Sequence, residues 1–307
     1  MKTHFLSQEA NHVRWNRDLA PALEIESGDT VEMELRDSSD GQVKPDWTTE
    51  TFAQLDRNRI HALTGPILVK GARPGDTLEV RIESIEHQGW GWTSLIPGLG
   101  LLPEHFTDPF LFLWKLEKTS TASLAPATIP LHPFCGIMGV APEEPGEHRT
   151  RPPGRFGGNL DVRQLSAGAR LYLPVCVAGA LFSAGDTHAA QGDGEVCING
   201  IEMPAQARFN FILHKDQPLR EPWAEVPLST RADTGSWVFI ASRAEFWPAA
   251  KAVVEQAIDF IVGRYKIPAQ LAYILCSITL DLKVSQCVNQ PMITLSGHLP
   301  KNIFPVN

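Results

Sequence analysis

The stretch PILVKGARPGDTLEVRIESIE, residues 66–86, alternates apolar and polar residues on both sides of a Pro-Gly-Asp turn. In its second half, Leu78, Val80 and Ile82 fall on one face, because successive side chains of a strand point to opposite faces. Residues 22–36, ALEIESGDTVEMELR, repeat this pattern around a Gly-Asp pair. Both stretches therefore predict β-hairpins and favour a protein built mainly from strands.

The composition of the 307-residue chain agrees with a large β protein, since 43% of its residues are hydrophobic and 24 Gly and 24 Pro are spread along it. The net charge is −8 and there is no basic block, which excludes a typical nucleic-acid binder. No apolar run approaches the ~18 residues of a membrane span, and the N-terminus lacks the apolar core of a signal peptide. The five cysteines form no CxxC pair, so we expect reduced thiols in the cytoplasm.

The C-terminal third has a different periodicity. Residues 248–263 carry apolar side chains at helical spacing, and residues 268–280 resemble them; each stretch opens with a proline. Both predict helices, and strand-like sequence follows at residues 285–295. The sequence thus predicts a large β body over residues 1–215 and a smaller α+β part over residues 216–307, packed on the same body.

Residues 157–197 concentrate the side chains that carry chemistry. They are Asp161, Asp186, His188, Asp193 and Glu195. Asp186 and His188 are two residues apart, so an extended segment places both on one face. Mixed oxygen and nitrogen ligands suit zinc or another borderline divalent ion. Glu195 follows a Gly-Asp-Gly turn that can fold it back to the same site, as in hydrolytic metal sites with a nearby carboxylate.

A structural role for the same residues is the alternative. Asp186 and Asp193 each lie in Gly-Asp pairs, which also cap ordinary turns. His188 precedes two alanines and fits a hydrogen-bonded core histidine as well as a ligand. Residues 194–202 and 207–213 have the pattern of two further strands. The residues alone therefore leave open a metal site, an acid/base site and a set of turn residues.

Six segments together resemble the acetamidase/formamidase family of amide hydrolases and cover residues 12–304 in the family's order. They are WNRDLAPALEIESGDTVEMELRD, HALTGPILVKGARPGDTLEVRI, HPFCGIMGVAP, GGNLDVRQL, LPVCVAGALFSAGDTHAAQGDGEV and LDLKVSQCVNQPMITLSGHLPKNIF. The resemblance implies a mainly β fold, a jelly-roll-like β-sandwich with smaller α/β parts. It also implies hydrolysis of short aliphatic amides to carboxylic acid and ammonia by a cytoplasmic homo-oligomer with a divalent metal.

The resemblance assigns roles residue by residue. Asp161, with Asn159, lies in the family's Gly-Gly-Asn-x-Asp element; Asp186 and His188 lie in Gly-Asp-x-His, and Glu195 in Gly-Asp-Gly-Glu. Asp161, Asp186 and His188 are the expected metal ligands. The expected ion is zinc, with calcium or another divalent ion as alternatives. Glu195 is the expected catalytic residue, which moves protons between water and the leaving amine.

Further candidates have less defined roles. Asp37 and His61 match family segments, although His61 begins a strand-like stretch and fits a backbone-bonding role equally. Cys135 lies three residues after His132, and a thiolate beside an imidazole is a nucleophile in other amidases. A Cys135-dependent amidase is therefore one alternative, and a buried apolar cysteine is its structural counterpart.

A non-catalytic jelly-roll module that binds its ligand through a metal is the other functional alternative. Such a module has no use for Glu195 as a base. For partners, we expect a small amide substrate and no nucleic acid or membrane. The 8 Trp and 14 Phe, with the family resemblance, predict a homodimer or higher homo-oligomer.

Overall fold

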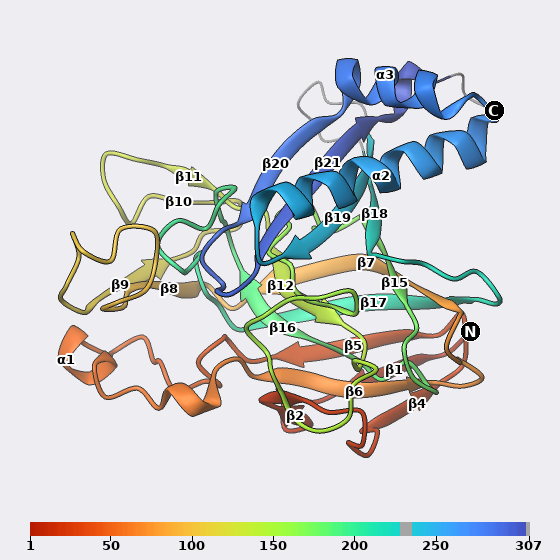
Figure 1. The fold of residues 1–307 in the computed structure, drawn as a ribbon. Helices are drawn as coiled ribbons and strands as arrows, with labels where there is room; N and C mark the ends of the chain where they lie inside the picture. The colour runs from red at the N-terminus through yellow and green to blue at the C-terminus, as the bar shows by residue number, and fades with distance from the viewer. Residues whose placement is uncertain (228–234, 305–307) are drawn as a thin grey trace.

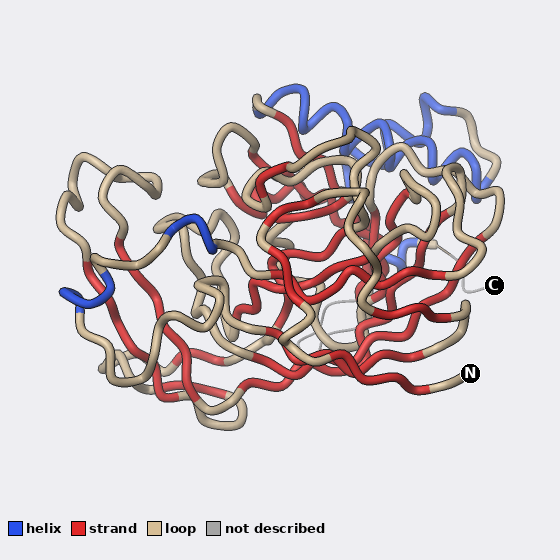
Figure 2. The backbone as a smooth tube through the Cα atoms, turned by 90° about the horizontal axis from the view of Figure 1, so that it is seen from below, coloured by secondary structure: helices blue, strands red, loops and turns tan. Residues whose placement is uncertain are grey.

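The computed structural model describes residues 1–227 and 235–304; residues 228–234 and 305–307, in the predicted C-terminal part, lie outside the described residues. Two β-sheets form the body, and the two long helices lie over one end of the larger sheet (Figure 1). Figure 2 shows that strands make up most of the regular structure. The mainly β sandwich with a C-terminal α+β part is therefore confirmed.

The larger sheet has nine strands and links the N-terminal region to the C-terminal region. In spatial order its strands are β1 (Thr3–Leu6), β5 (Thr30–Leu35), β17 (Ala205–His214), β7 (Thr77–His87), β15 (Arg170–Pro174), β18 (Trp223–Val226), β19 (Ser236–Arg243), β21 (Ile293–Pro300) and β20 (Asp281–Gln286). Only β1 and β5 pair in parallel within this sheet. The sheet is continuous across residues 215 and 216, and a domain division there stays a prediction.

The smaller sheet has six strands and carries the chemistry described below. Its strands are β14 (Gly157–Asn159), β12 (Phe134–Gly139), β16 (Phe182–His188), β6 (Leu63–Val69) and β2 (Asn11–His12), with β4 (Leu23–Ile25) parallel to β6. Three short ribbons complete the strands: β3 (Arg14–Trp15) with β13 (His148–Arg149), β8 (Trp90–Leu95) with β9 (Phe110–Lys115), and β10 (Ser120–Thr121) with β11 (Ile129–Pro130). The helices are α1 (Thr49–Phe52), α2 (Phe246–Tyr265), α3 (Ala269–Thr279) and two 3-10 turns, Arg57–Arg59 and Lys301–Ile303.

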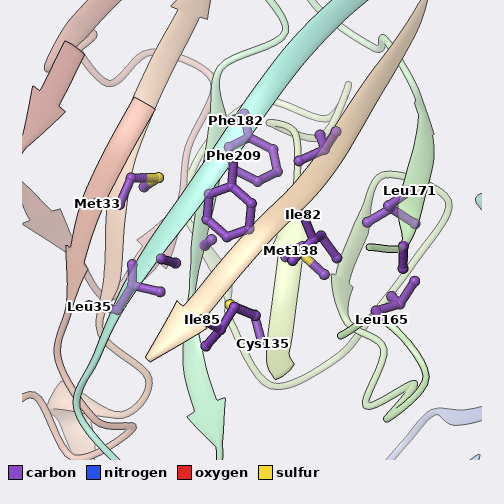
Figure 3. Packing of buried hydrophobic residues seen from close by; sticks show 14 of the residues in the cluster. Met33, Leu35, Ile82, Ile85, Cys135, Met138, Leu165, Leu171, Phe182 and Phe209 are labelled. Atoms are coloured by element: carbon purple, nitrogen blue, oxygen red, sulfur yellow. The ribbon is translucent and has the colours of Figure 1, made fainter. Parts of the chain in front are cut away.

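The main core fills the space between the two sheets (Figure 3). Phe182 of the smaller sheet packs its ring against Phe209 and Phe211 of the larger one, at centroid distances of 6.0 and 5.1 Å. All three side chains are fully buried. Burying one such side chain contributes about 1.5–3 kcal/mol, so this face-to-face packing holds the sheets together.

The strands of the two predicted hairpins form, but the hairpins themselves are wrong. The turn in residues 66–86 carries the chain from β6 in the smaller sheet to β7 in the larger one, and residues 22–36 lead likewise from β4 to β5. The echo between the two stretches has a structural counterpart, because β5 and β7 flank the same strand, β17. Local alternation specifies which face of a strand is buried, whereas its pairing partner is chosen by packing elsewhere in the chain.

Of the remaining predicted helices and strands, some are confirmed and one is wrong. The two C-terminal helices are confirmed as α2 and α3, and residues 207–213 lie in β17. The strand predicted over residues 194–202 is wrong, because this segment forms turns with only isolated bridges. Glu195 and Ile198 there adopt positive φ angles of 50° and 80°, which an extended strand does not allow.

Candidate metal centre

Neighbouring strands of the smaller sheet form the base of a buried polar cluster. Asp186 and His188 lie on β16, where His188 is opposite Phe134 of β12. Asp161 follows β14, and its backbone N–H donates to the carbonyl oxygen of Gly136 at 3.2 Å. A Cβ at Gly136 would lie 2.6 Å from Asp161 Oδ1 and 2.9 Å from Asp186 Oδ2. The glycine therefore provides the space in which the two carboxylates meet.

The predicted residues converge in this space, and a further carboxylate joins them. His188 Nε2 lies 3.5 Å from Asp186 Oδ1 and 3.0 Å from Glu202 Oε1, and His188 Nδ1 lies 3.9 Å from Asp161 Oδ1. Ligand atoms of Asp161, Asp186 and His188 all lie within 4.8 Å of one another, as do those of His188, Glu195 and Glu202. All five residues are buried. Two overlapping groups of potential ligands thus share His188.

The donor atoms of this cluster fit a divalent cation. Asp161 Oδ1, His188 Nε2 and Glu202 Oε2 are buried and have no hydrogen-bond partner among the described residues. Buried polar atoms without partners are rare, because removing a polar group from water costs free energy that only a new hydrogen bond or ion contact compensates. Carboxylate oxygen and imidazole nitrogen are ligands for zinc and similar divalent ions. A cation bound by either group of ligands would satisfy unpartnered atoms in this space.

Gln191 orients the imidazole of His188. The amide nitrogen of Gln191 donates to the backbone oxygens of Asp161, at 3.2 Å, and Ser285, at 3.4 Å. Its Oε1 atom therefore faces His188 and accepts a hydrogen bond from Nδ1 at 2.7 Å. This bond keeps a proton on Nδ1, so Nε2, the nitrogen that faces Asp186 and Glu202, is the one that can give up its proton and bind a cation. Outer partners of this kind fix the orientation of metal-binding histidines.

Asn289 brings the C-terminal part into the cluster. Its Nδ2 atom donates to Asp161 Oδ2 at 2.7 Å and lies 3.5 Å from Glu195 Oε2. The Asn289 backbone N–H is held in turn by Gln286 Oε1 at 2.9 Å. The site is therefore built from both predicted parts of the chain, and not from the β body alone.

The charges of the cluster perturb one another. Burial raises the pKa of Glu195 and of Asp161 well above the usual carboxyl range, and neighbouring acids raise both further. Burial also opposes ionisation of Asp186, but His61 and His188 outweigh it and lower the Asp186 pKa to about 2. Burial lowers the pKa of His188, yet Glu202 and Asp186 outweigh this effect and leave that pKa raised. The cluster has more carboxyl than imidazole groups, and a bound cation would take the place of the protons that otherwise neutralise these carboxyl groups.

Three of the predicted residues have unusual backbone conformations. Asp161, Asp186 and Glu195 adopt φ angles of 51°, 54° and 50°, in the left-handed region that disfavours residues with a Cβ. Such conformations cost about 1–3 kcal/mol each and persist where the surrounding structure imposes them, often at functional sites. Their gathering around one buried cluster is a second reason to treat it as functional.

Comparison with known proteins shows the family of this chain. A model of the acetamidase/formamidase family matches residues 1–148 and 144–306. The chain belongs to this family. Its structure superimposes on an acetamidase from Bacillus halodurans with a TM-score of 0.90 and 32% identity, covering 98% of both chains. It also superimposes on an acetamidase/formamidase-type protein from Thermoanaerobacter tengcongensis with a TM-score of 0.87 and 30% identity, covering 99% of this chain and 97% of the other.

Relatives found by sequence comparison are also named acetamidase or formamidase. The chain is 28% identical over 257 residues to an acetamidase from Mycolicibacterium smegmatis, covering 62% of this chain and 63% of the relative. It is 28% identical over 261 residues to a formamidase from Methylophilus methylotrophus, covering 67% and 64%. The aligned part spans 61–64% of the length of the curated relatives.

The other sequence-predicted residues of this family member lie around the cluster with different partners. Asp37 is buried but accepts hydrogen bonds from Ser39 and from Trp92 Nε1, the latter at 3.1 Å, and belongs to neither ligand group. The backbone N–H of His61 donates to Thr150 Oγ1 at 3.0 Å, and burial lowers the pKa of the His61 ring. Asn159 is buried with its Oδ1 atom unpartnered.

Cys135 is part of the hydrophobic core between the sheets (Figure 3). Its side chain is 1% exposed, and burial raises the pKa of its thiol. A thiol of raised pKa contains little of the thiolate that acts as a nucleophile. This setting favours the structural interpretation of Cys135 over the catalytic one.

Sequence reasoning missed Glu202, Gln191 and Asn289. Glu202 had a detectable signal, since a carboxylate between Ile201 and Met203 in an apolar segment indicates a buried acid with a specific partner. Gln191 and Asn289 act through contacts between segments distant in sequence, and no local pattern marks them. No helix among the described residues is long and apolar enough to cross a membrane.

Proposed function

We propose that the protein hydrolyses short aliphatic amides, of the formamide and acetamide type, to a carboxylic acid and ammonia. The observation that carries this proposal is the buried group of Asp161, Asp186 and His188. Asp161 Oδ1 and His188 Nε2 have no hydrogen-bond partner among the described residues, and the carboxyl group of Glu195, whose pKa is raised, lies beside His188. Membership of the family and the names of the relatives support the same reaction.

Asp161, Asp186 and His188 would hold a divalent cation, with zinc as the first choice and calcium or another divalent ion as alternatives. Such a cation polarises a carbonyl oxygen and lowers the pKa of water from 15.7 to about 7. Gln191 presents the lone pair of His188 Nε2 to this position, and Gly136 keeps the position open. The chain thus supplies a set of ligands whose orientation is fixed by their outer partners.

Glu195 moves the protons. Its carboxylate accepts a proton from the attacking water, whose oxygen bonds to the carbonyl carbon. It then delivers that proton to the nitrogen as the C–N bond breaks and ammonia leaves. A raised pKa suits both steps, because proton transfer is most efficient when the pKa of the group lies near the operating pH. Asn289, between Asp161 and Glu195, limits the directions in which the Glu195 carboxyl can face.

The test combines metal analysis with ammonia release from formamide, acetamide and propionamide. We expect a divalent metal in the purified protein, and turnover that a chelator abolishes and a thiol-blocking reagent leaves intact. Turnover that resists the chelator and fails with the thiol reagent would instead favour Cys135 as nucleophile. Tight metal binding without turnover of any amide would favour the non-catalytic binding module.

We also propose that the enzyme works as a homodimer in a reducing compartment such as the cytoplasm. All five cysteines are free thiols, which supports the compartment. The outer face of α3 supports the dimer: Leu271, Ile274 and Ile278 are exposed at helical spacing, and the helix contains no charged residue. An exposed apolar helix face of this kind is typical of a surface that another protein molecule covers.

A further inference from the structure

Four arginines from three distant segments come together beside the candidate metal centre. They are Arg14, Arg57, Arg149 and Arg151, here called the arginine rim. Arg14 of β3 is paired opposite Arg149 of β13. Arg14 Nη1 donates to the backbone oxygen of Asn58, next to Arg57, at 3.4 Å. Arg57 and Arg149 both lie within electrostatic reach of Arg151 and repel it.

The rim carries uncompensated positive charge. None of its arginines has a carboxylate within 4.0 Å among the described residues, whereas Arg36, Arg163 and Arg208 elsewhere in the chain all form ion pairs. Arg151 also makes no side-chain hydrogen bond within the described parts of the chain. This is unexpected in a chain with 35 acidic and 27 basic residues, where acidic partners are plentiful.

Arg151 is the member of the rim whose charge interacts with the cluster. The preceding residue, Thr150, accepts a hydrogen bond from the His61 backbone N–H at 3.0 Å. The ring of His61 interacts electrostatically with Asp186, and the guanidinium of Arg151 does so with both Glu195 and Asp186. Arg151 is half-buried, so its charge is partly removed from water without an ion pair to compensate. An anionic group of a ligand that pairs with Arg151 would compensate the free-energy cost of removing this charge from water.

We propose that Arg151 binds a carboxylate carried by the substrate, so that the preferred substrates are short amides bearing an acidic group, such as monoamides of small dicarboxylic acids. This inference rests on the proposed amide hydrolysis. A neutral amide offers the guanidinium a single carbonyl oxygen, whereas the fork of N–H donors matches a carboxylate in two charge-assisted hydrogen bonds. Arg57 and Arg149 are exposed. Their positive charge attracts an anionic substrate toward Arg151 and offsets its repulsion by the carboxylates of the cluster.

The reaction of such a substrate balances without any further reactant. Malonamate and water give malonate and ammonium: the C–N bond of the amide breaks, the water oxygen bonds to the carbonyl carbon, and both water protons end on nitrogen. The second carboxylate of malonamate takes no part in this chemistry. Arg151 is therefore a specificity-determining residue in this proposal, and its contribution appears in substrate choice.

The test uses malonamate and malonamide, which have nearly the same shape and differ by one negative charge. We expect kcat/KM of the wild-type enzyme to favour malonamate by about 10-fold or more, the size expected for a charge-assisted pair. R151Q should remove that preference, mainly by raising KM for malonamate, so that kcat/KM falls by about 10-fold more for malonamate than for malonamide. R155Q is the matched control, because Arg155 lies outside the rim and donates to the Arg220 backbone oxygen at 2.6 Å; its preference should stay wild-type.

Several results would overturn the inference. They are a wild-type preference for malonamide, an equal loss on both substrates in R151Q, and a fall in metal content in R151Q, which would make Arg151 only a counter-charge for the cluster. If R151Q keeps the malonamate preference and instead weakens inhibition by acetate, Arg151 holds the product carboxylate and not the substrate.

Failure of the proposed function is separately visible, because turnover of acetamide and malonamide is first measured on the wild-type protein. If the wild-type protein hydrolyses no amide, calorimetric titration with malonate still decides the carboxylate site. Binding weakened about 10-fold or more in R151Q supports it. Equal binding, or no binding, rejects it.

Discussion

Glu195 differs from Asp186 and His188 in local structure, because it does not belong to a strand. Asp186 and His188 are held by the ladder of β16, whereas Glu195 lies in a turn after Gly194. Its carboxyl is also near His188 and Glu202, so the geometry is compatible with a base and with a ligand. The two roles make different demands on the side chain, and a single substitution separates them.

For Glu195→Gln, we expect kcat to fall by about 10²–10⁴, because the amide keeps the shape but cannot accept a proton. Metal content should stay near that of the wild type, since the proposed ligands are other residues. Ammonia release and metal occupancy measured on the same preparation check both points. A parallel loss of metal would make Glu195 a ligand, and a near-normal rate would return it to a turn residue.

For His188→Ala, we expect metal occupancy at a fixed metal concentration to drop by about 10-fold or more, because this substitution removes the shared nitrogen ligand. The fold should persist, since the two sheets are held by the hydrophobic core. Metal analysis with a thermal melt of the metal-free protein is the measurement. The exposed His105 provides a control, and His105→Ala should bind metal normally. Full occupancy in His188→Ala would remove His188 from the ligand set.

At the scale of elements, the site depends on how closely β12, β14 and β16 approach one another. Gly136 of β12 has no Cβ, and the Asp161 and Asp186 carboxylates occupy the space that a Cβ would take. β12 therefore contributes to the site through the absence of a side chain at Gly136. This is a steric requirement of the tertiary structure, and the identity of the glycine alone does not reveal it.

For Gly136→Ala, we expect metal affinity to fall by about 10-fold or more, because the methyl group pushes one carboxylate away from its place beside His188. Gly192→Ala is the matched control: this glycine lies close to the cluster in sequence, and a Cβ there meets nothing within 4 Å. Isothermal titration with zinc compares the two variants. Equal zinc affinity in both would show that the carboxylates reposition freely and that β12 does not define the site.

At the scale of the whole molecule, α3 presents an exposed apolar face. Its inner side packs through Ala272 and Cys276, and Ile278 on its outer side is 74% exposed. Two such faces packed antiparallel about a two-fold axis bury apolar surface on both copies without charge repulsion. We expect the protein to sediment at twice its chain mass of 33.8 kDa at micromolar concentration.

The substitution Ile278→Glu tests the surface assigned to that dimer, because it places a charge in the centre of the apolar face. We expect this variant to sediment as a monomer and still to unfold in a cooperative thermal transition, which shows that each chain stays folded. Lys251→Glu, on an exposed position of α2, is the control for a charge change alone. A wild-type monomer across micromolar concentrations would reject the dimer, and a dimeric Ile278→Glu would reject α3 as its interface.

Local pattern was sufficient for what depends on neighbouring residues. The helical spacing after Pro248, the alternation in β5 and β7, and the gathering of Asp186, His188 and Glu195 within a few residues were all visible in the sequence. The reason is physical, since the faces of a helix or strand are set by backbone periodicity. Asp186 and His188 both lie on β16, but the left-handed φ of Asp186 is imposed by the tertiary structure and not by alternation along an extended strand.

What the sequence by itself determined was the mainly β class, the two C-terminal helices and the residues that could act in a metal centre. The tertiary structure alone decided that β4 and β6 pair in one sheet while β5 and β7 flank β17 in the other. It alone brought Glu202, Asn289 and the arginine rim to the cluster. Strand partners and long-range contacts are chosen by the free energy of packing whole faces together, which no single segment encodes.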